Sequence, residues 1–274
     1  MKERFKIGVF DSGVGGLTVL KELIHYVPRS DYIYFGDTAR LPYGSKSSET
    51  VARYATEAAK FLEKHGIQIL VVACNTATAL ALDAVADACT VPVFGVINPG
   101  AEAVSNISKT RKAVVIGTEA TVASHAYKRA LANCGIEAYE KACPLLVPLV
   151  EEGWTEHDVT EQVARIYLGE AFENGSEASD ALLLGCTHYP LLKPMLRRIL
   201  RPDVGIVDSA ESTALKVASE MGVKYEGEPA ETKLLKGDVK LQFYVTDSVE
   251  KFRRLGTRFL GYSVDDVQHA DLGG

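Results

Sequence analysis

The sequence lacks several features that mark other classes of protein. Its five cysteines, an odd number, include no CxxC pair and no metal-type spacing with histidine. No stretch approaches the roughly 18 apolar residues of a membrane span, and no apolar segment follows the three positive charges among the first ten residues. These absences argue against a zinc module, a disulfide framework and a membrane protein. We expect a cytoplasmic protein with reduced thiols and no metal.

Concentrated positive charge and low complexity are also missing. The formal net charge is −6, the isoelectric point is about 5.6, and the 30 lysines and arginines are scattered along the chain. Nucleic-acid binders usually carry a basic patch, so we expect no nucleic-acid partner. With no long linker, the 274 residues suffice for two domains with a core each.

Apolar runs and helix-compatible segments alternate along the chain. This alternation predicts βαβ units and therefore an α/β fold with parallel sheets. Besides two cysteine-containing runs, we expect strands at residues 7–10, 32–35, 91–96, 113–116, 204–208 and 241–246. Helices are expected at residues 16–26, 48–64, 76–87, 99–107, 120–133, 155–172, 189–200 and 209–221, with a loop at 143–152 and a polar stretch at 226–236.

One short phrase occurs twice. Ile69 to Thr76 reads ILVVACNT, and Ala181 to Thr187 reads ALLLGCT. Cys74 and Cys186 therefore each follow a strand that is buried on both faces, and each precedes a helix. Ligands of open α/β sheets bind at such strand ends, where the positive end of a helix favours a thiolate.

A second, weaker similarity extends the repeat. The segment KIGVFDS from Lys6 resembles KAVVIGT from Lys112. We infer two similar α/β lobes that each present one cysteine to a shared cavity. Two matched thiols are what an enzyme needs to act on both faces of one carbon.

The glycine-rich turn that starts at Asp11 has competing interpretations. A strand, clustered glycines and a helix are typical of a dinucleotide site, but Thr18 stands where the third glycine should be. The glycines could instead only permit a tight turn. Asp11 could be a helix N-cap or a carboxylate that orients or activates a thiol.

Other thiol chemistries fit the sequence less well. Leucines stand at the arginine positions of a phosphatase pattern after both cysteines. A Cys–His nucleophile formed by Cys186 and His188 would leave Cys74 unexplained. The remaining cysteines are expected to pack in the core, as free cysteines commonly do: Cys89, Cys134 and Cys143.

Four motifs together resemble the glutamate racemase family of the aspartate/glutamate racemase superfamily. They are DSGVGGLTVL from Asp11, GDTARLPYG from Gly36, ACNTATA from Ala73 and GCTHYPLL from Gly185. The resemblance spans most of the chain. It implies two flavodoxin-like, doubly wound parallel-sheet domains related by pseudo-twofold symmetry, with the active site between them. Residues 1–98 and 209–274 would form the first domain and residues 99–208 the second.

The resemblance also implies a reaction. L-glutamate and D-glutamate would be interconverted without pyridoxal phosphate, metal or other cofactor, supplying D-glutamate for peptidoglycan. Cys74 would deprotonate D-glutamate and Cys186 would deprotonate L-glutamate. Asp11 would assist Cys74, and His188 with Glu151 would assist Cys186.

Two of these assignments keep alternatives, and a further aspartate of the motifs has no assigned role. Glu152 could replace Glu151, and both could belong to a solvated loop. His188 could be a structural histidine. The role of Asp37 is undetermined, because an aspartate before a threonine is also a common turn or cap.

Matching the motifs assigns the substrate contacts as well. The α-amino and α-carboxylate groups would be held by Ser12, Asn75, Thr76 and Thr187. Tyr43 and Gly44 would meet the side-chain carboxylate, unless the Pro-Tyr-Gly segment is only a turn. Thr118 and Thr121 would join from the second lobe.

Two other functions stay open from the sequence. One is a racemase of another acidic amino acid, aspartate. The other is a non-enzymatic small-ligand or nucleotide-binding module whose thiols only pack. The sequence is compatible with a homodimer but does not determine the oligomeric state. A basic cluster near the end is expected to be a solvated helix face: Lys251, Arg253, Arg254 and Arg258.

Overall fold

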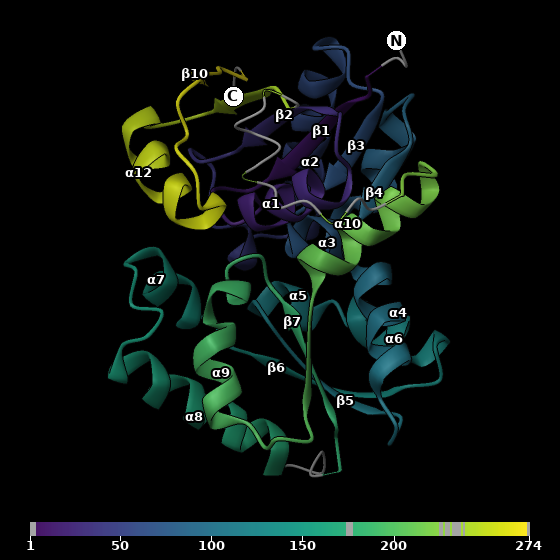
Figure 1. The fold of residues 1–274 in the computed structure, drawn as a ribbon, viewed down its shortest axis with the longest axis vertical. Coiled ribbons are helices and arrows are strands. Elements are labelled where there is room, and N and C mark those ends of the chain that lie inside the picture. The colour runs from purple at the N-terminus through teal and green to yellow at the C-terminus, as the bar shows by residue number, and fades with distance from the viewer. Residues whose placement is uncertain are drawn as a thin grey trace.

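The computed structural model describes residues 4–173, 178–224, 227, 231, 237 and 239–272, arranged as two α/β lobes (Figure 1). The strands are β1 (Lys6–Asp11), β2 (Asp31–Gly36), β3 (Ile69–Val72), β4 (Val93–Gly95), β5 (Lys112–Gly117), β6 (Glu137–Ala142), β7 (Ala181–Gly185), β8 (Gly205–Asp208), β9 (Leu241–Val245) and β10 (Val267–His269).

Helices connect these strands. The α-helices are α1 (Leu17–Tyr26), α2 (Ser48–Lys64), α3 (Asn75–Ala88), α4 (Ile97–Ile107), α5 (Glu119–Ala123), α6 (Ala126–Asn133), α7 (Leu146–Glu151), α8 (Asp158–Glu173), α9 (Lys193–Ile199), α10 (Ser209–Glu220) and α12 (Val249–Leu260). Two short 3₁₀ helices are η1 (Tyr43–Ser45) and η2 (Tyr189–Leu192).

Each lobe is built on one parallel sheet. The first has six strands in the order β10-β9-β2-β1-β3-β4, and the second has four in the order β6-β5-β7-β8. All neighbouring strands run parallel. The predicted α/β class with two parallel sheets is confirmed. Because parallel strands end at the same sheet edge, the residues after β1, β3, β5 and β7 gather where ligands bind in this class.

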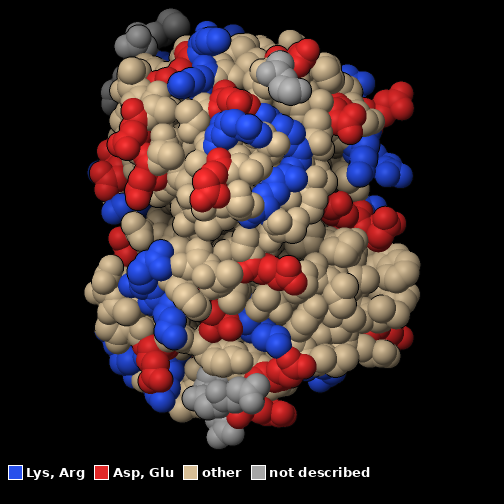
Figure 2. Space-filling model, turned by 180° about the vertical axis from the view of Figure 1, so that it is seen from behind, with Lys and Arg blue, Asp and Glu red and all other residues tan. Residues whose placement is uncertain are grey.

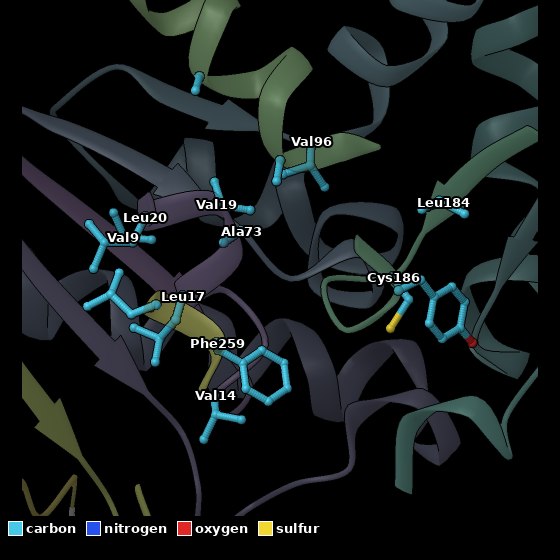
Figure 3. Packing of buried hydrophobic residues seen from close by; sticks show 14 of the residues in the cluster. Val9, Val14, Leu17, Val19, Leu20, Ala73, Val96, Leu184, Cys186 and Phe259 are labelled. Carbon is cyan, nitrogen blue, oxygen red and sulfur yellow. The ribbon is translucent and has the colours of Figure 1, made fainter. Parts of the chain in front are cut away.

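Buried side chains alternate between the two faces of the first sheet. Val9 and Val71 pack with α1, whereas Phe10 and Val72 pack with α2 and α3. The first of these clusters also contains Val114 and Leu182 of the second sheet, so apolar packing is continuous between the lobes. Figure 3 shows part of this cluster, with Cys186 among its members.

The end of the chain returns to the first lobe. After β8, α10 packs against α1, and β9 pairs with β2 from the register Tyr32↔Leu241 onward. The yellow C-terminal elements in Figure 1 accordingly lie with the purple and blue ones. This return is the one that the family resemblance implies.

Several predicted elements differ from the observed ones. The predicted loop at 143–152 contains the short helix α7. Its Pro148 does not prevent a helix, because it falls in the first turn, where proline is tolerated. The helix predicted at 120–133 is broken into α5 and α6 by His125, whose φ is +52°. The edge strands β6 and β10 were not predicted. Most of the polar stretch at 226–236 lies outside the described residues.

Candidate active site

A cavity of about 260 Å³ opens between the lobes, and both Cys74 and Cys186 lie in its wall. This volume is near the ~300 Å³ lower end of small-molecule sites, which suits a ligand the size of one amino acid. Other predicted site residues in the wall are Ser12, Tyr43, Gly44, Asn75, Thr76, Thr118, Glu151, Thr187 and His188. Asp11 and Thr121 do not line the cavity but lie directly behind it. Lining residues that the predictions missed are Gly13, Leu41, Pro42, Ser45, Glu119, Pro144, Val147 and Pro148.

The first thiol sits at the N-terminus of α3. Cys74 is the N-cap residue, and its Sγ accepts a hydrogen bond from the Ala77 amide at 3.4 Å. The same Sγ donates to Ser12 Oγ at 3.5 Å. Burial and the nearby charge of Asp11 raise the pKa of Cys74 to about 12. At neutral pH this group is therefore the protonated thiol, although it lies at a helix N-terminus.

The second thiol lies beside an imidazole–carboxylate pair. His188 Nδ1 is 3.9 Å from the Sγ of Cys186, and His188 Nε2 is 3.0 Å from Oε1 of Glu151. Burial alone would lower the pKa of His188, but the sulfur and the carboxylate raise it to about 10. The hydrogen bond from His188 lowers the pKa of Glu151. At neutral pH this pair is imidazolium and carboxylate, and its imidazole borders the second thiol.

Asp11 lies beneath the glycine-rich turn. Its carboxylate is buried, and Oδ2 accepts from the Gly13 amide at 2.9 Å. Its Oδ1 has no hydrogen-bond partner among the described residues. Burial raises the pKa of Asp11, and the charge of His188 opposes this rise. The carboxylate therefore acts on Cys74 through its charge, whereas Ser12 makes the hydrogen bond.

The glycine-rich turn brings the lobes into close contact. A Cβ on Gly15 would lie 2.1 Å from Thr187 Oγ1 and 2.6 Å from His188 Nδ1, so only glycine fits there. Thr18 Oγ1 donates to the carbonyl oxygen of Thr187 at 2.9 Å. The turn thus packs against the second lobe. Thr18, which stands in place of the third glycine of the dinucleotide motif, forms a hydrogen bond across the interface.

Three threonine hydroxyls form a second bridge between the lobes. Thr76 Oγ1 lies 2.9 Å from Thr118 Oγ1 and 3.2 Å from Thr121 Oγ1, and the last two are 2.9 Å apart. Thr118 is also the N-cap of α5, accepting from the Thr121 amide. These hydroxyls lie at the ends of β3 and β5 and can reorient toward a bound carboxylate.

Asn75 also links several elements. Its Oδ1 accepts from Tyr127 Oη of α6, and its Nδ2 lies 3.3 Å from Ser209 Oγ at the start of α10. The side chain therefore contacts the second lobe and the connection back to the first, while the residue still lines the cavity.

Asp37, whose role the sequence left undetermined, holds the loop that carries Tyr43. The buried carboxylate accepts from Arg40 Nε at 2.8 and 3.0 Å, from Thr246 Oγ1 at 2.9 Å, and from the Tyr43 hydroxyl. Burial and the charge of Asp37 raise the pKa of Tyr43 well above its usual value. Because this hydroxyl is bonded to Asp37, the loop presents Gly44 and the backbone of Tyr43 to a ligand, beside the other lining residues Leu41, Pro42 and Ser45.

The face of the molecule seen in Figure 2 carries no surface patch of one charge sign among its described residues. Acidic and basic side chains are mixed across it. Across the part of the chain that the structure describes, no group of three or more His, Cys, Asp or Glu side chains could hold a metal ion. No helix in the described ranges has the length and apolarity needed to cross a membrane.

Known proteins resemble this chain along its whole length. The profile of the Asp/Glu/Hydantoin racemase family matches residues 7–217. A glutamate racemase of Koribacter versatilis is 56% identical over 289 residues, covering 100% of this chain and 99% of that protein.

Solved structures agree with the sequence comparison. A glutamate racemase isoform from Bacillus anthracis has a TM-score of 0.88 at 38% identity and covers 99% of both chains. The glutamate racemase of Francisella tularensis, solved in complex with D-glutamate, has a TM-score of 0.86 at 38% identity and covers 98% of both. The chain therefore belongs to the Asp/Glu/Hydantoin racemase family, and the three relatives named above are glutamate racemases.

Proposed function

We propose that this chain is a cofactor-independent glutamate racemase that interconverts L-glutamate and D-glutamate and supplies D-glutamate for peptidoglycan. The observation that carries the proposal is the placement of Cys74 and Cys186, one from each sheet, in the wall of one amino-acid-sized cavity. Relatives of full length that are glutamate racemases support glutamate over aspartate as the substrate.

The two thiols exchange roles with the direction of reaction. From L-glutamate, the thiolate of Cys186 takes the α-proton, leaving the electron pair of the broken C–H bond on the α-carbon. The thiol of Cys74 then donates its proton to the opposite face, which inverts the configuration. From D-glutamate the same steps run in reverse. The raised pKa of Cys74 keeps it as the proton donor that the first direction needs.

The neighbouring groups act on charge that develops during the reaction. The imidazolium of His188, fixed by Glu151, lies where negative charge leaves or arrives at the Cys186 sulfur. An amino-acid α-carbon is a far weaker acid than a thiol, so most of the barrier must fall through preorganised donors and exclusion of water. We assign the donors to Ser12, Asn75, Thr76 and Thr187, with Thr118 and Thr121 behind or beside them.

Racemisation in D₂O tests this function directly. Purified protein is incubated with L-glutamate without added cofactor, while the ellipticity and the deuterium content at the α-carbon are followed. We expect the ellipticity to decay to zero with deuterium incorporation, and a much slower reaction with L-aspartate. Unchanged ellipticity and no deuterium in glutamate would refute the proposal, and activity on aspartate alone would change the substrate.

Three expectations accompany this proposal and stay predictions. The domain limits are residues 1–98 with 209–274, and residues 99–208. The enzyme is expected in the cytoplasm, where its product would be used, and a homodimer is the assembly with which the sequence is compatible. Sedimentation equilibrium of the purified protein measures the last of these, and a monomer at all concentrations would exclude it.

A further inference from the structure

The helix α12 contacts the acid–base pair of the second thiol from the opposite lobe. It belongs to the segment that completes the first sheet, whereas Glu151 ends α7 and His188 follows β7. Nη1 of Arg258 donates to the backbone carbonyl oxygen of Glu151 at 2.8 Å. The next residue, Phe259, meets the imidazole of His188 edge-on, with ring centroids 5.1 Å apart. In Figure 1, the yellow α12 lies directly above α7.

The turn after α7 is shaped to receive this guanidinium group. Gly153 has a φ of +83°, and a Cβ there would lie 2.6 Å from the Cζ of Arg258. The guanidinium therefore packs against the Cα of Gly153 while it holds the carbonyl of Glu151. A side chain at position 153 would be strained and would also displace the arginine.

Arg258 differs from the arginines of its helix with which the sequence grouped it as a solvated face, and Lys251 reaches Glu151 only through its charge, which joins the hydrogen bond from His188 in lowering the pKa of that carboxylate. Lys251, Arg253 and Arg254 are exposed, and Arg253 donates to the carbonyl oxygen of Asp265 within the same lobe. Arg258 is also exposed, yet its hydrogen bond crosses to the other lobe and ends on the residue whose carboxylate holds His188.

We propose that Arg258 is a positioning residue for the reaction: it fixes the main chain of Glu151, so that the carboxylate stays on His188 and His188 stays on Cys186. This inference rests on the proposed function, because it assigns Arg258 to the half of the reaction that Cys186 carries out. The first lobe thereby controls the geometry around Cys186, and α12 is the element through which it does so.

Overall turnover cannot separate the two halves of the reaction. The enantiomers are equally stable, so any variant must lose kcat/KM equally in both directions. Proton exchange in single-cysteine variants does separate them. In Cys74→Ala, Cys186 can still exchange the α-proton of L-glutamate with D₂O, and in Cys186→Ala, Cys74 can exchange that of D-glutamate.

The test adds Arg258→Met to each of these backgrounds. We expect exchange of L-glutamate by Cys186 to fall about tenfold, as loss of a charged hydrogen bond implies, whereas exchange of D-glutamate by Cys74 stays within about twofold. Arg258→Lys keeps a donor and should recover part of the loss. Arg254→Met, one turn earlier on the same helix, is the matched control and should leave both rates unchanged. Equal losses in both backgrounds, or none, would overturn the proposal.

A second readout does not depend on turnover. NMR titration of the His188 ring in otherwise unaltered protein should show its midpoint moved to lower pH by Arg258→Met and not by Arg254→Met. An unmoved midpoint would overturn the positioning role. If both single-cysteine parents lack exchange while this midpoint moves, the two-thiol mechanism fails and the role of Arg258 in placing Glu151 stands.

Discussion

Cys74 and Cys186 follow the same sequence phrase but have different neighbours. Cys74 contacts Ser12, and burial together with the charge of Asp11 raises the pKa of Cys74. Cys186 contacts His188, which in turn contacts Glu151. A repeated backbone therefore carries two differently tuned thiols. This asymmetry matches a reaction in which one sulfur starts as the proton donor and the other as the acceptor.

The raised pKa of His188 links its charge to stability. In the unfolded chain this pKa is near its usual 6.5, and in the folded protein it is about 10, so the folded state binds more protons between these values. The wild-type protein should therefore have a higher free energy of unfolding than His188→Asn, and this difference should be largest below about pH 6.5. The difference should shrink as the pH rises toward 10. Urea unfolding of both proteins across this range measures it; a difference that does not vary with pH would contradict the assignment.

Gly15 lies where the two lobes leave no room for a side chain. Gly15→Ala would drive a methyl group into Thr187 and His188. We expect activity to fall more than tenfold and the free energy of unfolding to fall by about 1–3 kcal/mol, as for overpacked sites.

Gly169→Ala is the matched control for this change. Within 4 Å its Cβ would meet only Glu173 Oε1, at 3.9 Å, in the middle of α8. Racemisation should be unchanged and stability should rise by up to about 1 kcal/mol. The steric argument would be wrong if Gly15→Ala behaved like this control in kinetic and unfolding assays.

At the residue scale, the sequence predicts the thiols and most cavity residues because their motifs are local. It does not predict what Asp37 and Arg258 do. Arg258 bonds to Glu151, 107 residues away, and Asp37 joins its neighbours Arg40 and Tyr43 to Thr246, 209 residues away, so both roles depend on tertiary contacts. Asp11 was expected beside Cys74, and the structure shows that its effect there is through charge.

At the scale of elements, central strands are more predictable than edge strands. β3 and β7 are continuous apolar runs because both their faces are buried. β6 reads EAYEKA, with charged residues that suit an exposed sheet edge, and β10 has only three residues. The break at His125 has only a weak local signal, because histidine is enriched among non-glycine residues with positive φ but still adopts that conformation rarely.

The loop between β2 and α2 depends on one buried carboxylate. Asp37→Asn would weaken the bond to Arg40, a half-buried cation that would keep Glu57 as its charged partner. Because the loop then holds Tyr43 and Gly44 less firmly, we expect KM for glutamate to rise about tenfold with a smaller change in kcat.

Tyr43→Phe provides the comparison for the loop. It removes one hydrogen bond but leaves Asp37 bonded to Arg40 and Thr246. Its KM should therefore rise less than that of Asp37→Asn. If steady-state kinetics showed the opposite order, or a loss confined to kcat, the loop would not depend on Asp37 in this way.

At the scale of the whole molecule, contacts between the lobes surround the cavity. Thr18 bonds to Thr187, Thr76 bonds to Thr118, and Arg258 bonds to Glu151. The apolar cluster behind the glycine-rich turn is shared by both sheets, and Figure 3 shows Val14 and Phe259 within it. The same interface therefore both stabilises the molecule and forms the walls of the site.

Each lobe supplies the thiol that acts on one enantiomer, and proton exchange by the single-cysteine variants measures each thiol separately. Cys74→Ala and Cys186→Ala are each incubated in D₂O with separate samples of L-glutamate and D-glutamate. We expect Cys74→Ala to exchange only the α-proton of L-glutamate, Cys186→Ala to exchange only that of D-glutamate, and neither variant to racemise glutamate. Racemisation by either variant at the wild-type rate, or exchange of both enantiomers by one cysteine, would contradict this assignment.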